Sequence, residues 1–163
     1  MLVRAATESD LDHLARVWYD SWQDAHALIV PAALKEARTL SSFRQRLHDD
    51  LASVGVVGPE GRPVGFYMVK GDELYQLFVA TEARGTGTAA ALIDAAETRL
   101  AAEGVATAWL ACAIGNTRAA RFYEKRGWHL AGTVVSELDT ANGIVPLEVW
   151  RYEKQLVRRR QEL

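Results

Sequence analysis

Cysteine is almost absent from this 163-residue chain, in which Cys112 is the single copy. One thiol cannot form a disulfide within the chain, so an apolar core must hold the fold, and a chain of this length can build one without a structural metal. No apolar run approaches the roughly 18 residues that span a bilayer, and the start Met-Leu-Val-Arg lacks the apolar stretch of a secretion signal. The sequence therefore predicts a soluble, cytoplasmic protein without a membrane partner.

An excess of either charge is also missing. Lys and Arg total 19 and Asp and Glu total 21, which gives a net charge of -2. A nearly neutral chain gives no electrostatic reason to expect nucleic acid as a partner. Because 49% of the residues are hydrophobic and 25% are charged, the composition is that of a folded domain. A small molecule or a protein is the expected partner.

Hydrophobic periodicity divides the chain into helices and strands. A first helix is predicted between the capping residues 7–10 and Pro31, because apolar side chains recur there at spacings of three and four. The other expected helices cover 39–52, 86–103 and 117–126, and the expected strands cover 2–6, 53–60, 61–70, 73–80, 105–112, 128–138 and 145–155. No linker or repeat interrupts this order, which predicts a single α+β domain over 1–163. Its sheet should be mixed but mainly antiparallel, with helices packed on its faces.

A glycine-rich loop, Arg84-Gly85-Thr86-Gly87-Thr88-Ala89, stands between a predicted strand and a predicted helix. The glycines allow a ligand to approach the backbone where the first amides of the helix have no partner, and Arg84 adds a cation. Unpaired amides and the positive end of the helix dipole suit a pyrophosphate. We therefore interpret the loop as a phosphate site, with an ordinary glycine-rich turn as the alternative.

Two other phosphate motifs fit this loop less well. The pattern Gly85-x-Gly87-x-x-Ala90 matches a dinucleotide-binding fingerprint, but the loop follows an antiparallel meander, and the next strand ends in Ala111-Cys112-Ala113 without an acidic residue. A P-loop is excluded because the chain contains no Gly-Lys-Ser or Gly-Lys-Thr.

A second polar pattern lies on the helix expected at 117–126. Asn116 and Tyr123 are seven residues apart, about two helical turns, so their side chains should project from the same side. Ala119 and Ala120 lie between them, and small residues flanked by an amide and a phenol form a shallow groove for a thin, polar chain. Phe122 is expected in the core, and a core role for Tyr123 is the alternative to a binding role.

The loop 84–89 and the segment 116–128, NTRAARFYEKRGW, together resemble the two signature segments of the GCN5-related N-acetyltransferases (GNAT). The resemblance covers essentially the whole chain, because the expected order of elements is also that of the family. It implies a three-layer fold with about seven strands, of which one neighbouring pair is splayed. One departure is Ala89, where many members have glycine.

The resemblance also implies a co-substrate, acetyl-coenzyme A, and a set of residues that bind it. The loop amides would hold the pyrophosphate, and a bulged strand would pair through Leu77, Phe78 and Val79 with the pantetheine arm. Asn116 would lie near the pantetheine, and Tyr123 near the sulfur. No metal is implied.

Acetyl transfer to an amine requires a proton donor for the leaving thiolate, a polarised carbonyl and a base. Tyr123 is the expected acid, and the backbone amide of Val79 would polarise the carbonyl. Glu73 shares a strand face with Tyr75 and is the first choice of base, with a solvated surface acid as the alternative. His26 and His48 are other candidates for the base. Cys112 is expected in the core rather than as a nucleophile.

The acceptor amine is the least determined feature of the sequence. In the family, the first helices and the last hairpin usually recognise it, so Trp18, Trp22, Asp24, His26 and Tyr75 are candidates to line its pocket. Packing of Trp18 and Trp22 in the core is the alternative. The expected activity is acetylation of a primary amine on a small molecule or peptide by direct transfer. A catalytically silent acyl-CoA sensor and an interaction module with the same fold are alternatives, and a homodimer stays open.

Overall fold

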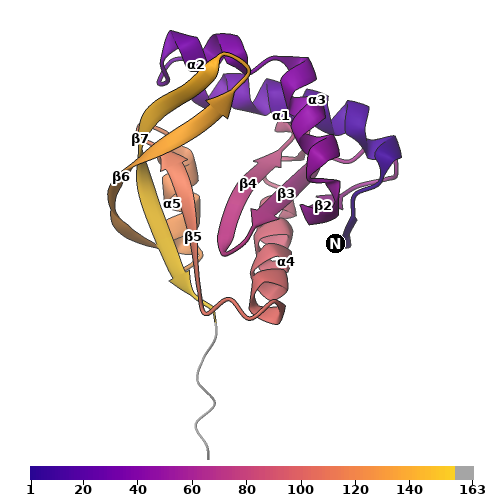
Figure 1. Cartoon of the computed structure of the whole chain (residues 1–163). Coiled ribbons are helices and arrows are strands. Elements are labelled where there is room, and N and C mark those ends of the chain that lie inside the picture. Colours follow the sequence, from indigo (N-terminus) through magenta and orange to yellow (C-terminus); the bar gives the residue numbers. More distant parts are fainter. Residues whose placement is uncertain (157–163) are drawn as a thin grey trace, which may run out of the picture.

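The chain forms one seven-stranded sheet with the strand order β1-β2-β3-β4-β5-β7-β6 (Figure 1). This computed structural model describes residues 1–156, so the last seven residues of the expected domain lie outside it. The strands are β1 (Val3–Ala5), β2 (Val54–Val57), β3 (Gly65–Lys70), β4 (Glu73–Val79), β5 (Thr107–Ala113), β6 (His129–Thr140) and β7 (Gly143–Gln155). All neighbouring strands are antiparallel except β4 and β5. The predicted mixed, mainly antiparallel sheet is confirmed.

Helices cover both faces of this sheet, as expected. They are α1 (Leu11–His26), α2 (Ala32–Ala37), α3 (Leu40–Asp49), α4 (Thr88–Ala102) and α5 (Thr117–Lys125). The sequence pattern does not predict the short helix α2, because Pro31 indicates only where the first helical pattern ends. Pro31 instead precedes the first turn of α2, where its fixed φ angle and missing N–H are tolerated.

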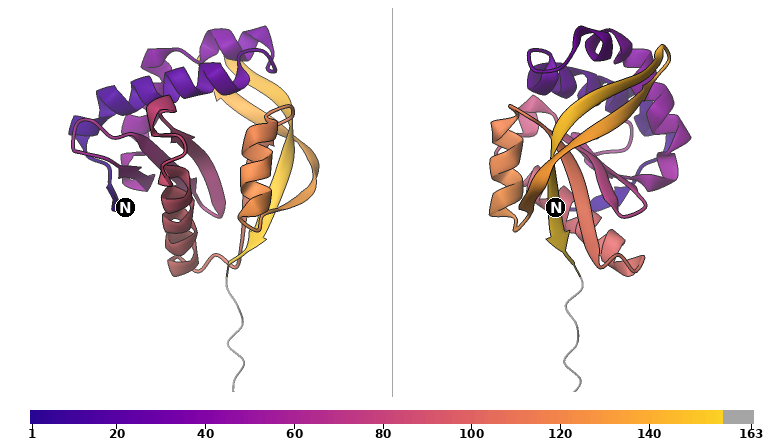
Figure 2. Two further views of the ribbon diagram at one scale, coloured as in Figure 1. Left: turned by 180° about the vertical axis from the view of Figure 1, so that it is seen from behind. Right: turned by 60° about the vertical axis from the view of Figure 1, so that its left-hand side comes forward.

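Two apolar clusters, one on each face of the sheet, hold the layers together. Trp18 of α1 lies against Phe43 of α3 and Phe66 of β3, with ring centroids 4.6 and 5.3 Å apart. On the opposite face, α4 contributes Leu92 and Leu100, both fully buried. Figure 2 shows α4 and α5 on the side of the sheet away from α3. The three-layer arrangement is thereby confirmed.

The strands β4 and β5 diverge from one another near the middle of the sheet. Their parallel pairing is limited to Glu73 and Trp109, and the two strands separate from there toward the glycine-rich loop (Figure 1). A bulge between β3 and β4 leaves Tyr75 as the extra residue, since Met68 pairs with Gln76 and the next pair is Val69 with Leu74. The expected bulge and splay are both present, and they leave one edge of β4 open.

None of the helices within residues 1–156 combines the length and the apolar character that crossing a bilayer requires.

Candidate active site

The glycine-rich loop leads into α4, and the first backbone amides of this helix have no hydrogen-bond partner within residues 1–156. Gly85 and Gly87 have φ angles of 76° and 86°, a conformation that L side chains rarely adopt. The first intrahelical bond of α4 is from Ala91 N to Gly87 O, 3.0 Å long. Within residues 1–156, the preceding amides of residues 88–90 donate no hydrogen bond. The helix start therefore presents the unpaired N–H groups and positive dipole end that bind anions.

Asp24 lies beside this loop rather than in an acceptor pocket. Its carboxylate accepts hydrogen bonds from Arg84, at 2.8 Å, and from Arg118, at 3.4 Å. The bond from Arg84 is the main reason why the pKa of Asp24 falls below its ordinary value. Asp24 was expected near the acceptor, but its position on α1 turns its side chain toward the loop. The exposed carboxylate of Asp24 thus binds both guanidinium groups and holds Arg84 and Arg118 close together beside the loop.

A cavity of about 400 Å³ extends from the loop along the open edge of β4. We call it the loop cavity. It is lined by Ser21, Ala25, Leu77, Phe78, Val79, Ala83, Arg84, Gly85, Gly87, Thr88, Ala89, Ala90, Asn116, Arg118, Ala119, Phe122 and Tyr123. Every residue that the sequence assigned to the coenzyme lines it, with the exception of Thr86. The Thr86 hydroxyl instead forms hydrogen bonds with Ala83 O and with the Thr88 hydroxyl.

The open edge of β4 offers backbone groups to this cavity. Ala80 N donates to Val64 O at 2.8 Å, toward the β3 side. Because successive residues of an antiparallel strand direct their amides to opposite sides, the amides of Leu77 and Val79 point into the gap between β4 and β5. The Val79 carbonyl accepts a hydrogen bond from Ser21 at 3.3 Å. Because β4 pairs with β5 only at Glu73 and Trp109, the amides of Leu77 and Val79 have no partner on β5.

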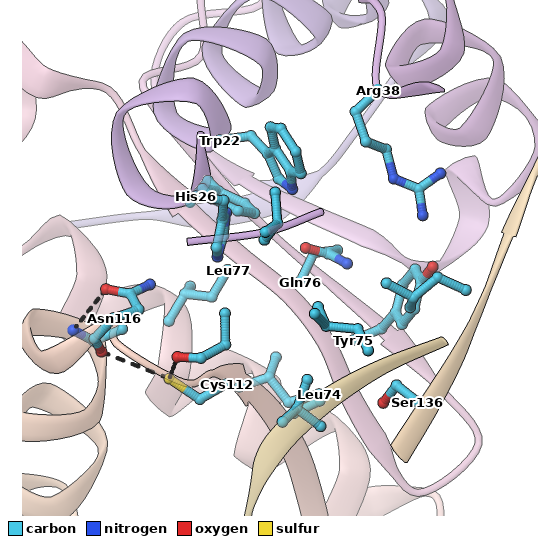
Figure 3. A pocket seen from close by; sticks show the side chains of 18 of the residues that line it. Trp22, His26, Arg38, Leu74, Tyr75, Gln76, Leu77, Cys112, Asn116 and Ser136 are labelled. Carbon is cyan, nitrogen blue, oxygen red and sulfur yellow. Dashed lines mark hydrogen bonds between the residues drawn. The ribbon is translucent and has the colours of Figure 1, made fainter. Parts of the chain in front are cut away.

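A second cavity, of about 160 Å³, lies between α1, the bulge in β4 and the β6–β7 hairpin (Figure 3). We call it the inner cavity. It shares five residues with the loop cavity, Leu77, Phe78, Asn116, Ala119 and Tyr123. Its lining includes four of the five residues expected to contact the acceptor, Trp18, Trp22, His26 and Tyr75. Trp18 and Trp22 are at the same time core residues, with 0% and 7% exposure.

Asn116 and Tyr123 project from the same side of α5, as predicted, and both line both cavities. The Asn116 side chain also caps the helix by accepting a hydrogen bond from Ala119 N at 3.4 Å. Tyr123 is partly buried, and its hydroxyl forms no hydrogen bond within residues 1–156. Burial, and then the nearby Cys112 thiol, raise the pKa of Tyr123, so that the phenol keeps its proton at neutral pH.

Glu73 is the only carboxylate among the residues that line the inner cavity. Burial raises the pKa of Glu73 to about 7, against the smaller opposing effects of Lys70 and Arg151. A carboxyl group that titrates near neutral pH can both accept and release a proton there. Glu73 is therefore a partly buried carboxyl group at the wall of the inner cavity.

The two histidines are less suitable as bases. His26 lines the inner cavity, but burial lowers its pKa to about 4, and its buried Nδ1 has no partner within residues 1–156. Such an imidazole is neutral at pH 7 and holds a proton weakly. His48 is exposed on α3 beside Asp49, outside both cavities.

Two arginines in the inner cavity were missed by sequence reasoning. Arg38 and Arg46 belong to the expected helical region 39–52 and its margin, where charged residues are commonplace. Arg38 is only 6% exposed, and the chain places it at the C-terminal end of the unpredicted helix α2. No motif marks either residue, so only the tertiary fold reveals them.

Among residues 1–156, no group of three or more His, Cys, Asp or Glu side chains could hold a metal ion.

Comparisons with known proteins identify relatives of this chain. The profile of the Acetyltransferase (GNAT) family matches residues 11–128. Uncharacterised N-acetyltransferases of Mycobacterium bovis and Mycobacterium tuberculosis are 36% identical over 112 residues, which cover 66% of this chain and 69% of theirs.

Solved structures share the fold. A GCN5-related N-acetyltransferase from Rhodopseudomonas palustris aligns with a TM-score of 0.74 and 23% identity, over 95% of both chains. The PaiA N-acetyltransferase from Thermoplasma acidophilum, solved in complex with coenzyme A, aligns with a TM-score of 0.64 and 19% identity, over 94% of this chain and 98% of that one.

Proposed function

The chain belongs to the GNAT family of acetyltransferases, and from that premise we propose that it moves the acetyl group of acetyl-coenzyme A directly onto a primary amine of a small molecule or peptide. The observation that carries the proposal is the meeting of the two cavities at Asn116 and Tyr123, where β4 and β5 separate. One cavity suits the donor and the other suits the acceptor. Where they share walls, the two reacting groups can meet.

The residues of the loop cavity fit acetyl-coenzyme A. The unpaired amides at the start of α4 suit its pyrophosphate, and Arg84 and Arg118 add positive charge nearby. The free amides of Leu77 and Val79 suit the pantetheine arm, which could pair with β4 as an added strand. Acetyl-coenzyme A supplies the acetyl group as a thioester, which is activated for attack by an amine.

Three groups of the protein would then share the chemistry. Glu73, directly or through a water molecule, accepts the proton of the acceptor ammonium or amine. The Val79 amide faces the gap and donates a hydrogen bond to the oxygen on which negative charge develops. Tyr123, protonated and without another partner within residues 1–156, donates its proton to the leaving sulfur.

The environment of Cys112 supports direct transfer. Its thiol is buried, and burial raises its pKa to about 12, so that almost no thiolate is present at neutral pH. The sulfur lies 3.7 Å from the carbonyl oxygen of Asn116 and 3.8 Å from that of Ala113, as a weak donor. A buried thiol in this state is a poor nucleophile.

Turnover of acetyl-CoA over a broad library of primary amines, read by release of free thiol and by the mass of the acetylated amine, tests the proposal. We expect thiol release that depends on at least one amine, with a product heavier by one acetyl group. Tight coenzyme binding with no amine-dependent release across the library would instead indicate a silent acyl-CoA sensor.

A further inference from the structure

Two guanidinium groups line the inner cavity without an acidic partner. Arg38 donates to the carbonyl oxygen of Asp139 at 3.1 Å, and Arg46 donates to the Tyr75 hydroxyl at 2.7 Å. No carboxylate within residues 1–156 forms an ion pair with either group at up to 4.0 Å. Buried charges in proteins are as a rule paired. The buried Arg38, with the partly buried Arg46 beside it, therefore indicates a missing anion.

Each arginine is held in place by the fold. Arg38 is 94% buried, since only 6% of its surface is exposed, and Figure 3 shows its guanidinium group pointing into the cavity. The Arg46 guanidinium lies over the Trp18 ring, 4.5 Å from its centroid, and close to the Tyr75 ring. Rigid guanidinium groups present planar donor pairs that match an oxyanion.

The charges around the cavity leave a positive excess. Burial, and to a smaller extent the nearby Arg46, lowers the pKa of Arg38 to about 10, so Arg38 is still cationic at neutral pH. The exposed Asp139 acts on Arg38 only from a distance. His26 is neutral, and Glu73 is the only carboxylate that lines the inner cavity itself. Asp49, Asp50, Glu137 and Asp139 line a neighbouring pocket that shares Arg46 and Glu73 with it. The lining of the inner cavity therefore favours an acceptor that carries a negative charge besides its amine.

Arg38 also lies away from the wall that the two cavities share. In Figure 3, Arg38 is on the opposite side of the cavity from Asn116 and Cys112, with Gln76 between them. An acceptor that spans the cavity would place its amine near the shared wall and its other end near the arginines.

We infer that the acceptor is a small amine that carries an oxyanion, a carboxylate or a phosphate, which Arg38 and Arg46 bind while the amine lies toward the wall that the two cavities share. The inference rests on the proposed function and names the substrate class of the same site. The anion neutralises the excess charge of the cavity and holds the amine at the distance that the cavity imposes.

Binding of acetylated products tests the inference without turnover. The protein is saturated with coenzyme A, and dissociation constants are measured for N-acetyl-L-amino acids, for N-acetyl derivatives of glycine, β-alanine, 4-aminobutyrate and 6-aminohexanoate, and for the carboxamide of each. N-acetyl-O-phosphoethanolamine is compared with N-acetylethanolamine in the same way. We expect at least one acid or phosphate to bind tenfold or more tightly than its neutral partner.

Variants assign the preference to the arginines. Arg38→Gln and Arg46→Gln should each reduce it to less than threefold. Arg44→Gln removes the same charge from the same region, where Arg44 is exposed and pairs with Asp12 at 2.6 Å, and should keep the preference. If Arg38→Gln does not fold, the test uses Arg46→Gln alone. Arg38→Lys keeps the positive charge and should retain part of the preference for the acid or phosphate.

The outcomes separate the inference from the proposed function. The inference is overturned if each acid binds no more tightly than its carboxamide and the phosphate no more tightly than its alcohol. It is also overturned if both Arg38→Gln and Arg46→Gln keep the preference for the anionic compounds. If the enzyme acetylates amines without a carboxylate or phosphate in preference to amines that carry one, the inference is overturned while the proposed function stands. Selective binding of acids with no acetylation of any amine contradicts the proposed function alone.

Discussion

Replacing Tyr123 with phenylalanine removes one hydroxyl group from the wall that the two cavities share. That hydroxyl forms no hydrogen bond within residues 1–156, so its loss leaves no buried group unpaired. The ring keeps its contacts with Phe122, Trp128 and Tyr152, whose centroids are 5.7, 6.4 and 6.3 Å away. We therefore expect the free energy of unfolding to change by less than about 1 kcal/mol.

Turnover should respond very differently. A positioned general acid contributes a factor of roughly 10² to 10⁴, so kcat should fall by that amount, equivalent to about 3–5 kcal/mol of transition-state stabilisation. The dissociation constant of acetyl-CoA should stay within about threefold, because the loop and the edge of β4 are unchanged. The assay is thiol release at saturating amine, combined with calorimetric titration of acetyl-CoA.

Tyr152→Phe is the matched control. The Tyr152 hydroxyl donates to Glu124 at 2.9 Å and lines neither cavity. Its loss should lower stability by about 1–3 kcal/mol and leave turnover nearly unchanged. A Tyr123→Phe variant with wild-type kcat, measured where chemistry limits the rate, would remove Tyr123 from the mechanism. Joint loss of stability and coenzyme affinity would show a structural tyrosine instead.

Three further predictions concern the base, the loop and the thiol. The rate should rise with pH through about 7 as Glu73 loses its proton, and Glu73→Gln should abolish that rise and lower kcat by roughly 10² to 10⁴, which pH profiles of both proteins measure. Gly87→Val should weaken acetyl-CoA binding about tenfold or more by calorimetry, because its side chain would enter open space beside the α4 amides. Gly104→Val is the matched control. Gly104 has a similar φ angle of 88°, so the substitution introduces the same backbone strain, but this variant should bind acetyl-CoA with normal affinity. Cys112→Ala should cost about 1 kcal/mol in thermal unfolding and keep turnover within a few-fold; loss of all activity would favour a covalent route.

The fold was largely predictable because its signals are local. Periods of two and of three to four residues marked the strands and the long helices, and glycines marked the loop before α4. The helix α2 was missed, since its six residues are too few to show a period. A pairing of Asp24 with Arg84 was also out of reach, because it joins residues 60 positions apart in the sequence.

The candidate site was predictable only in part, for the same reason. The loop residues, Asn116 and Tyr123 form contiguous segments with a recognisable pattern. The inner cavity is assembled from α1, α2, α3, β4, β5, α5 and the β6–β7 hairpin, so only their positions in space show that Arg38 and Arg46 belong to it. The raised pKa of Glu73 likewise depends on burial, which no pattern of neighbours in the sequence specifies.

The central claim is that the acetyl group passes directly from the coenzyme in the loop cavity to an amine in the inner cavity, without a covalent acetyl-enzyme intermediate. A rapid-quench experiment with excess enzyme, radiolabelled acetyl-CoA and the best amine of the library tests it most directly. We predict that the label moves from acetyl-CoA to the acetylated amine in one phase, and that no labelled protein forms with or without the amine. Label that accumulates on the protein before product forms, or that is released as acetate whether or not the amine is present, would contradict the claim.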